Sequence, residues 1–369
     1  MMADTVRVAM TLTQNWHKVP GGTATAANRL AAALAATGGV DLIGVVPAGP
    51  PPAEPWLPPI PTTPLGLRVP WLYDSWHHLR RPRVSSASGP VDLVHVTIPI
   101  APPRERVPMV ASVHDLLPLT MPEMFNRRGV RLMARGLQRI AGEAAMVMVP
   151  AEVVRADFVA HGFDPARLRV VPLGVEPRPP ADPEASAGAL HRHGLEGPYV
   201  LFVGTAEPRK GLDVLIDAVR LLDRPGLTLA LAGPDGWGDA LGPRLDALGD
   251  RVRRLGFVPE AALPLLQAGA AVCCLPSRAE GFGLPVLEAM AAGAPVVTIR
   301  GTSMQEVAGD AALCVPAGDA GALATALATV LDEPALADEL RGRGRERAAR
   351  YPWSRTAAAV LEVYREVRQ

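Results

Sequence analysis

Short apolar stretches alternate with longer helical patterns along the whole chain. In the first half, stretches rich in valine and leucine predict strands at residues 6–12, 40–46, 91–98, 110–113, 145–149 and 168–171. Apolar residues at helical spacing predict helices between them, including residues 23–36 and 128–140. This alternation is typical of repeated βα units around a mainly parallel sheet.

The same alternation begins again after residues 174–198. That segment carries proline, glycine and small residues without an apolar period, so we predict an interdomain linker there. Further strands are expected at residues 199–203, 227–231, 252–256, 271–275, 295–299 and 312–315. The sequence therefore predicts an α/β protein with two doubly wound parallel-sheet domains, at residues 1–175 and 176–350. Their strands would point their carboxyl ends at a central cleft, where open α/β sheets bind ligands.

Residues 47–83 break the alternation. The first part, "PAGPPPAEPWLPPIPTTP", is too rich in proline for the interior of a sheet or helix and predicts a surface loop. The second part, "LRVPWLYDSWHHLRRPR", mixes aromatic side chains with arginines. Two interpretations stay open for it: a helix whose aromatics pack on the domain, or an edge that binds the acceptor or touches a membrane.

The composition supports two domains and excludes a strong electrostatic field over the whole protein. A chain of 369 residues exceeds the size at which a single core keeps growing. Lys plus Arg and Asp plus Glu are equal at 37 each, so no net charge attracts nucleic acid or an anionic membrane. Any anion binding must be local.

The cysteines and the hydropathy indicate the compartment. Cys273, Cys274 and Cys314 lie in apolar stretches without metal-ligand spacing, which indicates buried thiols in a reducing compartment. No stretch approaches the roughly 18 to 20 apolar residues of a membrane span, and the start of the chain lacks a leader pattern. We expect a cytoplasmic protein, at most peripheral at the inner membrane face.

A cationic loop precedes the first helix of the second half. "VGTAEPRKGLDVLIDAV" (residues 203–219) runs from a strand through a glycine turn at Gly204 to Arg209 and Lys210, and then into a helix. Two cations beside a helix N-terminus suit an anion such as a diphosphate. A solvated pair of loop cations is the alternative interpretation.

A second motif, "SRAEGFGLPVLEAM" (residues 277–290), carries two carboxylates. Glu280 lies in the loop and Glu288 about one turn into the helix that Pro285 begins, while glycines 281 and 283 allow close backbone approach to a ligand. Eight residues of continuous helix would separate the acids by about 12 Å. A hydrolytic pair needs about 5 to 9.5 Å, so the spacing favours two carboxylates that contact different parts of one ligand.

These motifs resemble the retaining family 4 glycosyltransferases of the GT-B fold, which has two Rossmann-like domains. The resemblance rests on "EGFGLPVLE" with "EPRKG" upstream and extends to "PGGTATAANRLAAAL", "VHDLLPLTMPE", "RVVPLGVEP" and "GTSMQEVAGDAALCVPAGD". It is nearest to mannosyltransferase-like members. It implies a nucleotide-sugar donor, with GDP-mannose expected first, and a carbohydrate, lipid-linked or small-molecule acceptor. It also implies that the last helix, over residues 351–369, crosses back onto the first domain. We expect a hinge near residues 174–198 and near residue 350 to close the cleft.

The resemblance also implies roles for single residues. Glu288 would bind the ribose and Glu280 the transferred sugar, while Arg209 and Lys210 would hold the diphosphate and stabilise the charge that develops on it. His114, with Asp115 beside it, would lie near the sugar and acceptor. The remaining expected contacts are Gly22 at the phosphates or acceptor, Gly204 at the donor, the backbone N–H groups of Phe282, Gly283 and Leu284 at the sugar, and Phe257 and Val258 at the nucleobase.

Other functions are weaker matches. The chain contains no Asp-x-Asp motif, so no metal site and no cofactor are expected. A dehydrogenase would need Gly-x-Gly-x-x-Gly after a strand, and neither half has it. A sugar-nucleotide epimerase of similar fold and a non-catalytic, sugar-nucleotide-binding partner of a transferase remain as alternatives, and a phosphorylase would need a cofactor lysine that the sequence does not reveal.

Overall fold

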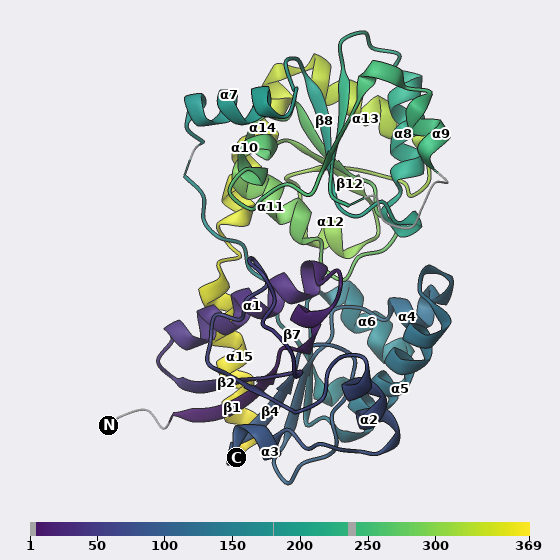
Figure 1. The fold of residues 1–369 in the computed structure, drawn as a ribbon. Helices are drawn as coiled ribbons and strands as arrows, with labels where there is room; N and C mark the ends of the chain where they lie inside the picture. The colour runs from purple at the N-terminus through teal and green to yellow at the C-terminus, as the bar shows by residue number, and fades with distance from the viewer. Residues whose placement is uncertain (1–4, 180, 235–240) are drawn as a thin grey trace. The chain divides into compact units, whose positions relative to one another are not determined.

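The chain divides into two units, each built around one parallel sheet (Figure 1). The computed structural model describes residues 5–179, 181–234 and 241–369. Unit 1 contains residues up to Gly174 together with Trp353–Gln369, and unit 2 contains Val175–Pro352. The prediction of two doubly wound α/β domains is confirmed.

Seven parallel strands form the sheet of unit 1, in the order β3-β2-β1-β4-β5-β6-β7. Their bounds are β1 Val6–Thr11, β2 Val40–Val46, β3 Thr62–Pro64, β4 Leu93–Val96, β5 Met109–Ser112, β6 Met146–Val149 and β7 Leu168–Val170. Strand β3 corrects the prediction of a plain surface loop at residues 47–64. Proline is tolerated there because β3 is an edge strand, where one side of the backbone needs no ladder partner.

Helices cover both faces of this sheet. Alternate side chains such as Val94, Val96 and Ala111 pack in one core with helices α2, α5 and α6. The side chains between them, His95 and Ser112, point to the opposite face, where α15 packs beside α1. The helices of unit 1 are α1 Gly21–Ala36, α2 Trp71–His78, α3 Ser85–Ser88, α4 Leu117–Thr120, α5 Arg127–Glu143, α6 Glu152–Ala160 and α15 Trp353–Arg368.

The aromatic segment at residues 67–83 forms helix α2, which packs on the domain. Tyr73 and Trp76 are buried in the unit 1 core, whereas Trp71 is 69% exposed. The indole N–H of Trp76 donates to the carbonyl oxygen of Pro82 at 2.9 Å, which satisfies its polar group. The packing interpretation therefore holds for two of the three aromatics, and Trp71 remains on the surface.

Six parallel strands form the sheet of unit 2, in the order β10-β9-β8-β11-β12-β13. Their bounds are β8 Tyr199–Val203, β9 Thr228–Ala232, β10 Val252–Gly256, β11 Val272–Leu275, β12 Val296–Ile299 and β13 Leu313–Val315. Cys273 and Cys274 are buried in the central strand β11, as predicted. Cys314 is only half-buried because β13 lies at the sheet edge.

The helices of unit 2 include one that the sequence did not predict. Helix α7 lies inside the segment expected to be a linker, of which residue 180 is outside the described residues. The side chain of Asp182 accepts a hydrogen bond from the backbone of Ala185 and caps this helix. The helices of unit 2 are α7 Pro183–Arg192, α8 Leu212–Leu222, α9 Gly242–Asp246, α10 Leu263–Gly269, α11 Leu284–Ala292, α12 Ser303–Ala308, α13 Ala320–Asp332 and α14 Pro334–Ala348.

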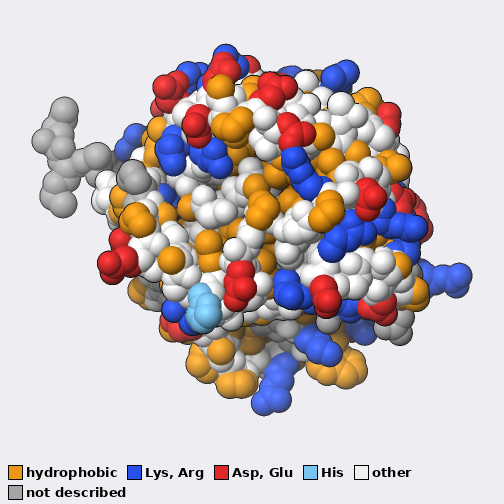
Figure 2. Space-filling view, turned by 90° about the horizontal axis from the view of Figure 1, so that it is seen from above, with side chains coloured by type: hydrophobic (Ala, Val, Ile, Leu, Met, Phe, Trp, Pro, Cys, Tyr) orange, Lys and Arg blue, Asp and Glu red, His pale blue; other side chains and the backbone are white. Residues whose placement is uncertain are grey.

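Surface charge and hydropathy agree with the balanced composition. Basic and acidic side chains are interspersed with hydrophobic ones on the face shown in Figure 2. Within the described parts of the chain, no single helix has the length and apolar character to cross a bilayer, and only the sharply bent pair α13 and α14 meets that test together.

Candidate active site

Two loops of unit 2 meet where the strand order of its sheet reverses. Strand β8 lies between β9, which follows it, and β11, which comes much later in the chain. Loops that leave the carboxyl ends of β8 and β11 therefore lie side by side at the switch point, the usual ligand site of such sheets. The first loop carries Arg209 and Lys210, and the second carries Glu280.

Three charged side chains converge at this point. The Nζ of Lys210 lies 2.5 Å from Oε1 of Glu280, and the Nη1 of Arg209 lies 3.2 Å from its Oε2. The Nε of Arg209 also donates to Glu207 at 2.8 Å. Residues 70 positions apart in the sequence therefore form one ion-pair cluster at the carboxyl edge of the sheet.

Glu280 is a buried carboxylate that is kept ionised. Burial alone would raise the pKa of Glu280, but the charges of Lys210 and Arg209 and hydrogen bonds from Lys210 and Ser277 hold that pKa below its usual value. The carboxylate is therefore negative at neutral pH, and it neutralises part of the positive charge beside it.

Close backbone packing joins the two loops. Gly211 adopts a left-handed conformation at φ +66°, and a Cβ there would lie 2.1 Å from the carbonyl oxygen of Pro276. The backbone N–H of Arg278 donates to the carbonyl of Arg209 at 2.7 Å, and its guanidinium pairs with Asp213 at 2.6 Å. The sequence pattern did not reveal Arg278 as a support of the site, although Arg278 lies within the glutamate motif, two residues before Glu280.

The loop that carries Glu280, residues 276–283, ends where helix α11 begins, and we call it the acidic loop. Pro285 stands in the first turn of α11, as predicted, and Glu288 is half-buried in the second turn. Gly283 has φ +101°, and a Cβ there would meet the side chain of Met304 at 2.8 Å. The hydroxyl of Ser303, which sequence reasoning missed, donates to the carbonyl of Glu280 at 2.7 Å. The glycine thus has a packing reason as well as the predicted role in ligand approach.

The other residues expected at the donor occupy neighbouring loops of unit 2. Gly204 follows β8 and lies beside the side chain of Lys210. Phe282 is buried, and Leu284 begins α11. Phe257 follows edge strand β10 and is 65% exposed, whereas Val258 is buried. An exposed ring at the carboxyl end of a strand is available for stacking.

His114 and Gly22 belong to unit 1 and lie at the carboxyl ends of its strands. His114 follows β5 and lines a cavity of about 20 Å³ together with Thr97, Ser112 and Thr356. Burial lowers the pKa of His114 to about 4, so its imidazole is neutral at pH 7. Asp115 accepts a hydrogen bond from the backbone of Leu117 at the start of α4.

Gly22 lies in the first turn of α1 and is exposed. A Cβ added there would meet no atom within 4 Å, so packing within unit 1 does not require glycine at this position. The buried side chain of Gln14, which follows β1, donates to the hydroxyl of Thr97 at 3.0 Å and ties together the loops after β1 and β4. These two strands flank the switch point of the first sheet.

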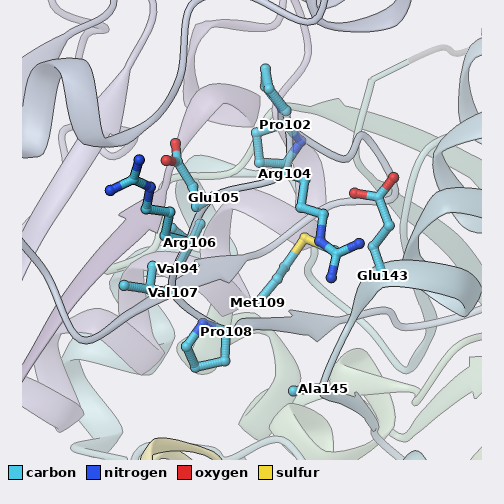
Figure 3. A pocket seen from close by; sticks show the side chains of 11 residues that line it. Val94, Pro102, Arg104, Glu105, Arg106, Val107, Pro108, Met109, Glu143 and Ala145 are labelled. Carbon is cyan, nitrogen blue, oxygen red and sulfur yellow. The ribbon is translucent and has the colours of Figure 1, made fainter.

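A larger cavity of unit 1 contains none of the predicted site residues. It has a volume of about 250 Å³ and is lined by residues 102–109 together with Val94, Glu143 and Ala145. Figure 3 shows Arg104 and Glu143 on one side of it and Glu105 and Arg106 on the other. Met109 begins β5, so the cavity lies at the amino-terminal edge of the sheet, away from the carboxyl ends that carry His114.

Ligands for a metal ion do not gather at the site. Within residues 5–179, 181–234 and 241–369, the structure contains no group of three or more His, Cys, Asp or Glu side chains placed to hold a metal. The charges that face Glu280 are those of Lys210 and Arg209. The site can therefore bind an anion through fixed cations and hydroxyl groups through carboxylates.

Comparison with known proteins agrees with this geometry. Residues 20–179 match the model of "Glycosyltransferase Family 4", and residues 197–333 match "Glycosyl transferases group 1". The O-antigen chain mannosyltransferase B of Escherichia coli is 32% identical over 69% of this chain and 70% of its own length. The D-inositol 3-phosphate glycosyltransferase of Jonesia denitrificans is also 32% identical, over 73% of this chain and 68% of its own.

Solved structures extend the match to the whole fold. Sucrose-phosphate synthase from Thermosynechococcus elongatus superposes with a TM-score of 0.78 over 98% of both chains, at 23% identity. Anabaena HepE in complex with UDP-glucose superposes with a TM-score of 0.77 over 98% of this chain and all of its own, at 18% identity. On this match in sequence and fold, the chain belongs to the group 1, family 4 glycosyltransferases of the GT-B fold.

Proposed function

We propose that the protein is a retaining hexosyltransferase that uses a nucleotide-diphosphate sugar without a metal ion. The observation that carries the proposal is the cluster of Lys210, Arg209 and Glu280 at the switch point of the second sheet. Its fixed cations suit a diphosphate leaving group, because they stabilise the negative charge that grows as the glycosidic bond breaks. Glu280 would contact hydroxyl groups of the transferred sugar, and Glu288 those of the ribose.

The ion pairs suggest how the donor enters the site. A diphosphate beside Lys210 and Arg209 would replace Glu280 as the partner of these cations. The cations would keep an anionic partner, and the Glu280 carboxylate would be released to accept hydrogen bonds from the sugar hydroxyl groups in place of the ionic contacts that it loses. The backbone N–H groups of Phe282, Gly283 and Leu284 would contact the sugar, Gly204 the phosphates, and Phe257 and Val258 the nucleobase.

Residues of unit 1 would serve the acceptor side. His114 is neutral at pH 7, so it would act as a hydrogen-bonding group at the sugar and not as a fixed cation. Gly22 would allow the start of α1 to approach the phosphates or the acceptor. We do not assign Glu280 as a nucleophile. Retention would instead follow from attack of the acceptor on the face that the leaving diphosphate occupied, within a tight ion pair.

The relatives supply the order in which donors should be tested. The Escherichia coli relative is a mannosyltransferase, so GDP-mannose is the first candidate donor. The UDP-glucose bound to HepE makes UDP-hexoses the second. The names of the relatives also support glycan, lipid-linked and inositol-phosphate acceptors.

A donor screen tests the proposal. Thermal stabilisation and slow donor hydrolysis are measured with GDP-, UDP- and dTDP-sugars, with and without EDTA, and the anomeric configuration of the product is read by NMR. We expect one donor class to stabilise the protein, activity in EDTA, and a product with the donor's configuration. An inverted product, strict dependence on a divalent ion, or release of an epimerised sugar nucleotide would each contradict the proposal.

A peripheral contact with the cytoplasmic membrane face is part of the proposal. Trp71 and Leu79, at the two ends of α2, are 69% and 70% exposed. Arg127 and Arg131 of α5 are exposed and available to anionic head groups, whereas Arg128 between them pairs with Asp74. Sedimentation with vesicles of phosphatidylglycerol, against phosphatidylcholine vesicles as the control, tests this contact. Binding to neither kind of vesicle would remove the membrane from the proposal, and equal binding to both would remove the role of the arginines.

A further inference from the structure

Tyr351, the next-to-last residue of unit 2 in the sequence, contacts the acidic loop. Its ring lies against that of Phe282, with ring centroids 6.1 Å apart and an interplanar angle of 65°. Phe282 is only 4% exposed and stands two residues after Glu280. The ring contact therefore restrains the part of the chain that presents the backbone N–H groups expected at the sugar.

Arg347 holds Tyr351 in this position. Its guanidinium donates to the Tyr351 hydroxyl at 2.9 Å and lies 5.2 Å from the centre of that ring. It also donates to the carbonyl oxygens of Val307 and Glu306, at 2.7 and 2.8 Å, at the end of helix α12. Arginine at this place satisfies carbonyls that a helix C-terminus leaves without intrahelical partners.

Helix α12 also contacts the acidic loop directly. Ser303, its first residue, donates to the carbonyl of Glu280, and Met304 packs against Gly283. The acidic loop is thus held on one side by the start of α12 and on the other by Tyr351. Arg347 connects these two supports, because it donates both to the end of α12 and to the hydroxyl of Tyr351.

The backbone of Tyr351 also forms a hydrogen bond with the first residue of unit 2. The N–H of Val175 donates to the carbonyl of Tyr351 at 2.7 Å, and Val175 forms an isolated parallel bridge with Pro352. Val175 and Pro352 are the first and last residues of unit 2. The residue that supports Phe282 is therefore part of the place where the chain enters and leaves this unit.

We propose that Tyr351 is a positioning residue for the acidic loop. Tyr351 holds this loop through Phe282, and Arg347 fixes the position of Tyr351. This inference rests on the proposed role of the loop in donor binding. A loop held in its binding conformation loses less conformational freedom when the donor binds, which raises affinity without any new contact. Because coupling between two sites is reciprocal, a nucleotide that stabilises the loop should also stabilise the contacts that hold Tyr351, including its hydrogen bond from Val175.

A set of variants of the full chain tests the proposal. Binding of UDP, GDP and dTDP is measured by calorimetry, together with the donor KM and kcat. We expect Tyr351→Ala to weaken nucleotide binding and raise the donor KM about tenfold, with a smaller effect on kcat. Tyr351→Phe keeps the ring against Phe282 and should rescue affinity to within about twofold of wild type.

Tyr199→Phe is the matched control for loss of a structural tyrosine hydroxyl in the same unit. The hydroxyl of Tyr199 donates to the Leu266 carbonyl, and Tyr199 begins β8 at the edge opposite to the site. We expect this variant to lower the unfolding temperature but to leave nucleotide affinity unchanged. If Tyr351→Ala does the same, Tyr351 is only a packing residue and the proposal is wrong.

Hydrogen exchange supplies a readout that needs no substitution. In wild-type protein, the nucleotide that binds should slow exchange of the Val175 amide. Unchanged exchange would show that the loop is not coupled to the hydrogen bond between Val175 and Tyr351. If wild type binds none of the three nucleotides, the proposed donor site fails and the inference fails with it. If wild type binds one and Tyr351→Ala binds it equally well, only the inference fails.

Discussion

The ammonium group of Lys210 lies 2.5 Å from the carboxylate of Glu280, in a contact that joins the loops after β8 and β11. Both side chains are largely buried, at 12% and 13% exposure. A pair in this environment interacts more strongly than an exposed surface pair, and removal of one partner leaves a buried charge uncompensated. Loss of either partner should therefore destabilise the site.

Substitution of Glu280 should lower the catalytic activity strongly while the protein stays folded. We expect Glu280→Gln to lower kcat/KM about 100-fold to 1,000-fold, because the amide cannot replace the carboxylate at the sugar. Glu207→Gln is the control, since Glu207 also pairs with Arg209 but has no proposed contact with the donor. Kinetics with the donor found in the screen would measure both. Similar losses in the two variants would contradict a specific role for Glu280.

Glu288 should act on donor binding. Loss of hydrogen bonds from the ribose hydroxyls to a charged carboxylate in Glu288→Gln should raise the donor KM about tenfold, with little change in kcat. Glu339→Gln, on the exposed surface of α14 where Glu339 pairs with Arg343, is the matched control and should leave both parameters unchanged. A fall in kcat at constant KM would place Glu288 at the reacting atoms instead.

Gly211 should be required for the meeting of the two loops. Gly211→Ala brings a Cβ against the Pro276 carbonyl in addition to the cost of a left-handed conformation, which is about 1 to 2 kcal/mol by itself. Gly226→Ala provides the control, because Gly226 has φ +79° but open space around its Cβ position. We expect a clearly larger loss in the free energy of unfolding at Gly211, accompanied by weaker donor binding. Equal losses, measured by urea denaturation, would show that the close approach costs nothing.

Stability should fall as the pH drops below 6.5. Burial, with a smaller effect from His114, lowers the pKa of His95 to about 3, and burial lowers that of His114 to about 4, while unfolded histidines titrate near 6.5. Between these values the unfolded chain binds protons that the folded chain does not. Each histidine should therefore reduce the free energy of unfolding by about 1.4 kcal/mol per pH unit over its window.

The expected loss can be assigned to one histidine. His114→Gln should show a shallower fall in the free energy of unfolding between pH 6.5 and 5 than wild type, because one buried imidazole is removed. Urea titrations at several pH values measure the slopes of both proteins, and identical slopes would show that the His114 imidazole does not contribute.

Much of the fold could be predicted because both sheets are buried on two faces. Such strands must be continuous apolar stretches, so their positions are visible in the sequence even where their ends are uncertain by a few residues. Strand β3 was missed because it is a short edge strand that contains a proline, and α7 was missed because its apolar face is narrow. Both lie where few contacts impose a pattern.

The sequence by itself determined the strands other than β3, the two-domain division of the pattern and the chemistry of the loops at Arg209, Lys210 and Glu280. Only the tertiary structure decided that β8 and β11 are neighbours, that Ser303 supports Glu280, and that Tyr351 reaches Phe282 from 69 positions away. Local periodicity reports the conformation and burial of a segment. Strand order and long-range contacts instead depend on how whole segments pack, and no short stretch of sequence contains that information.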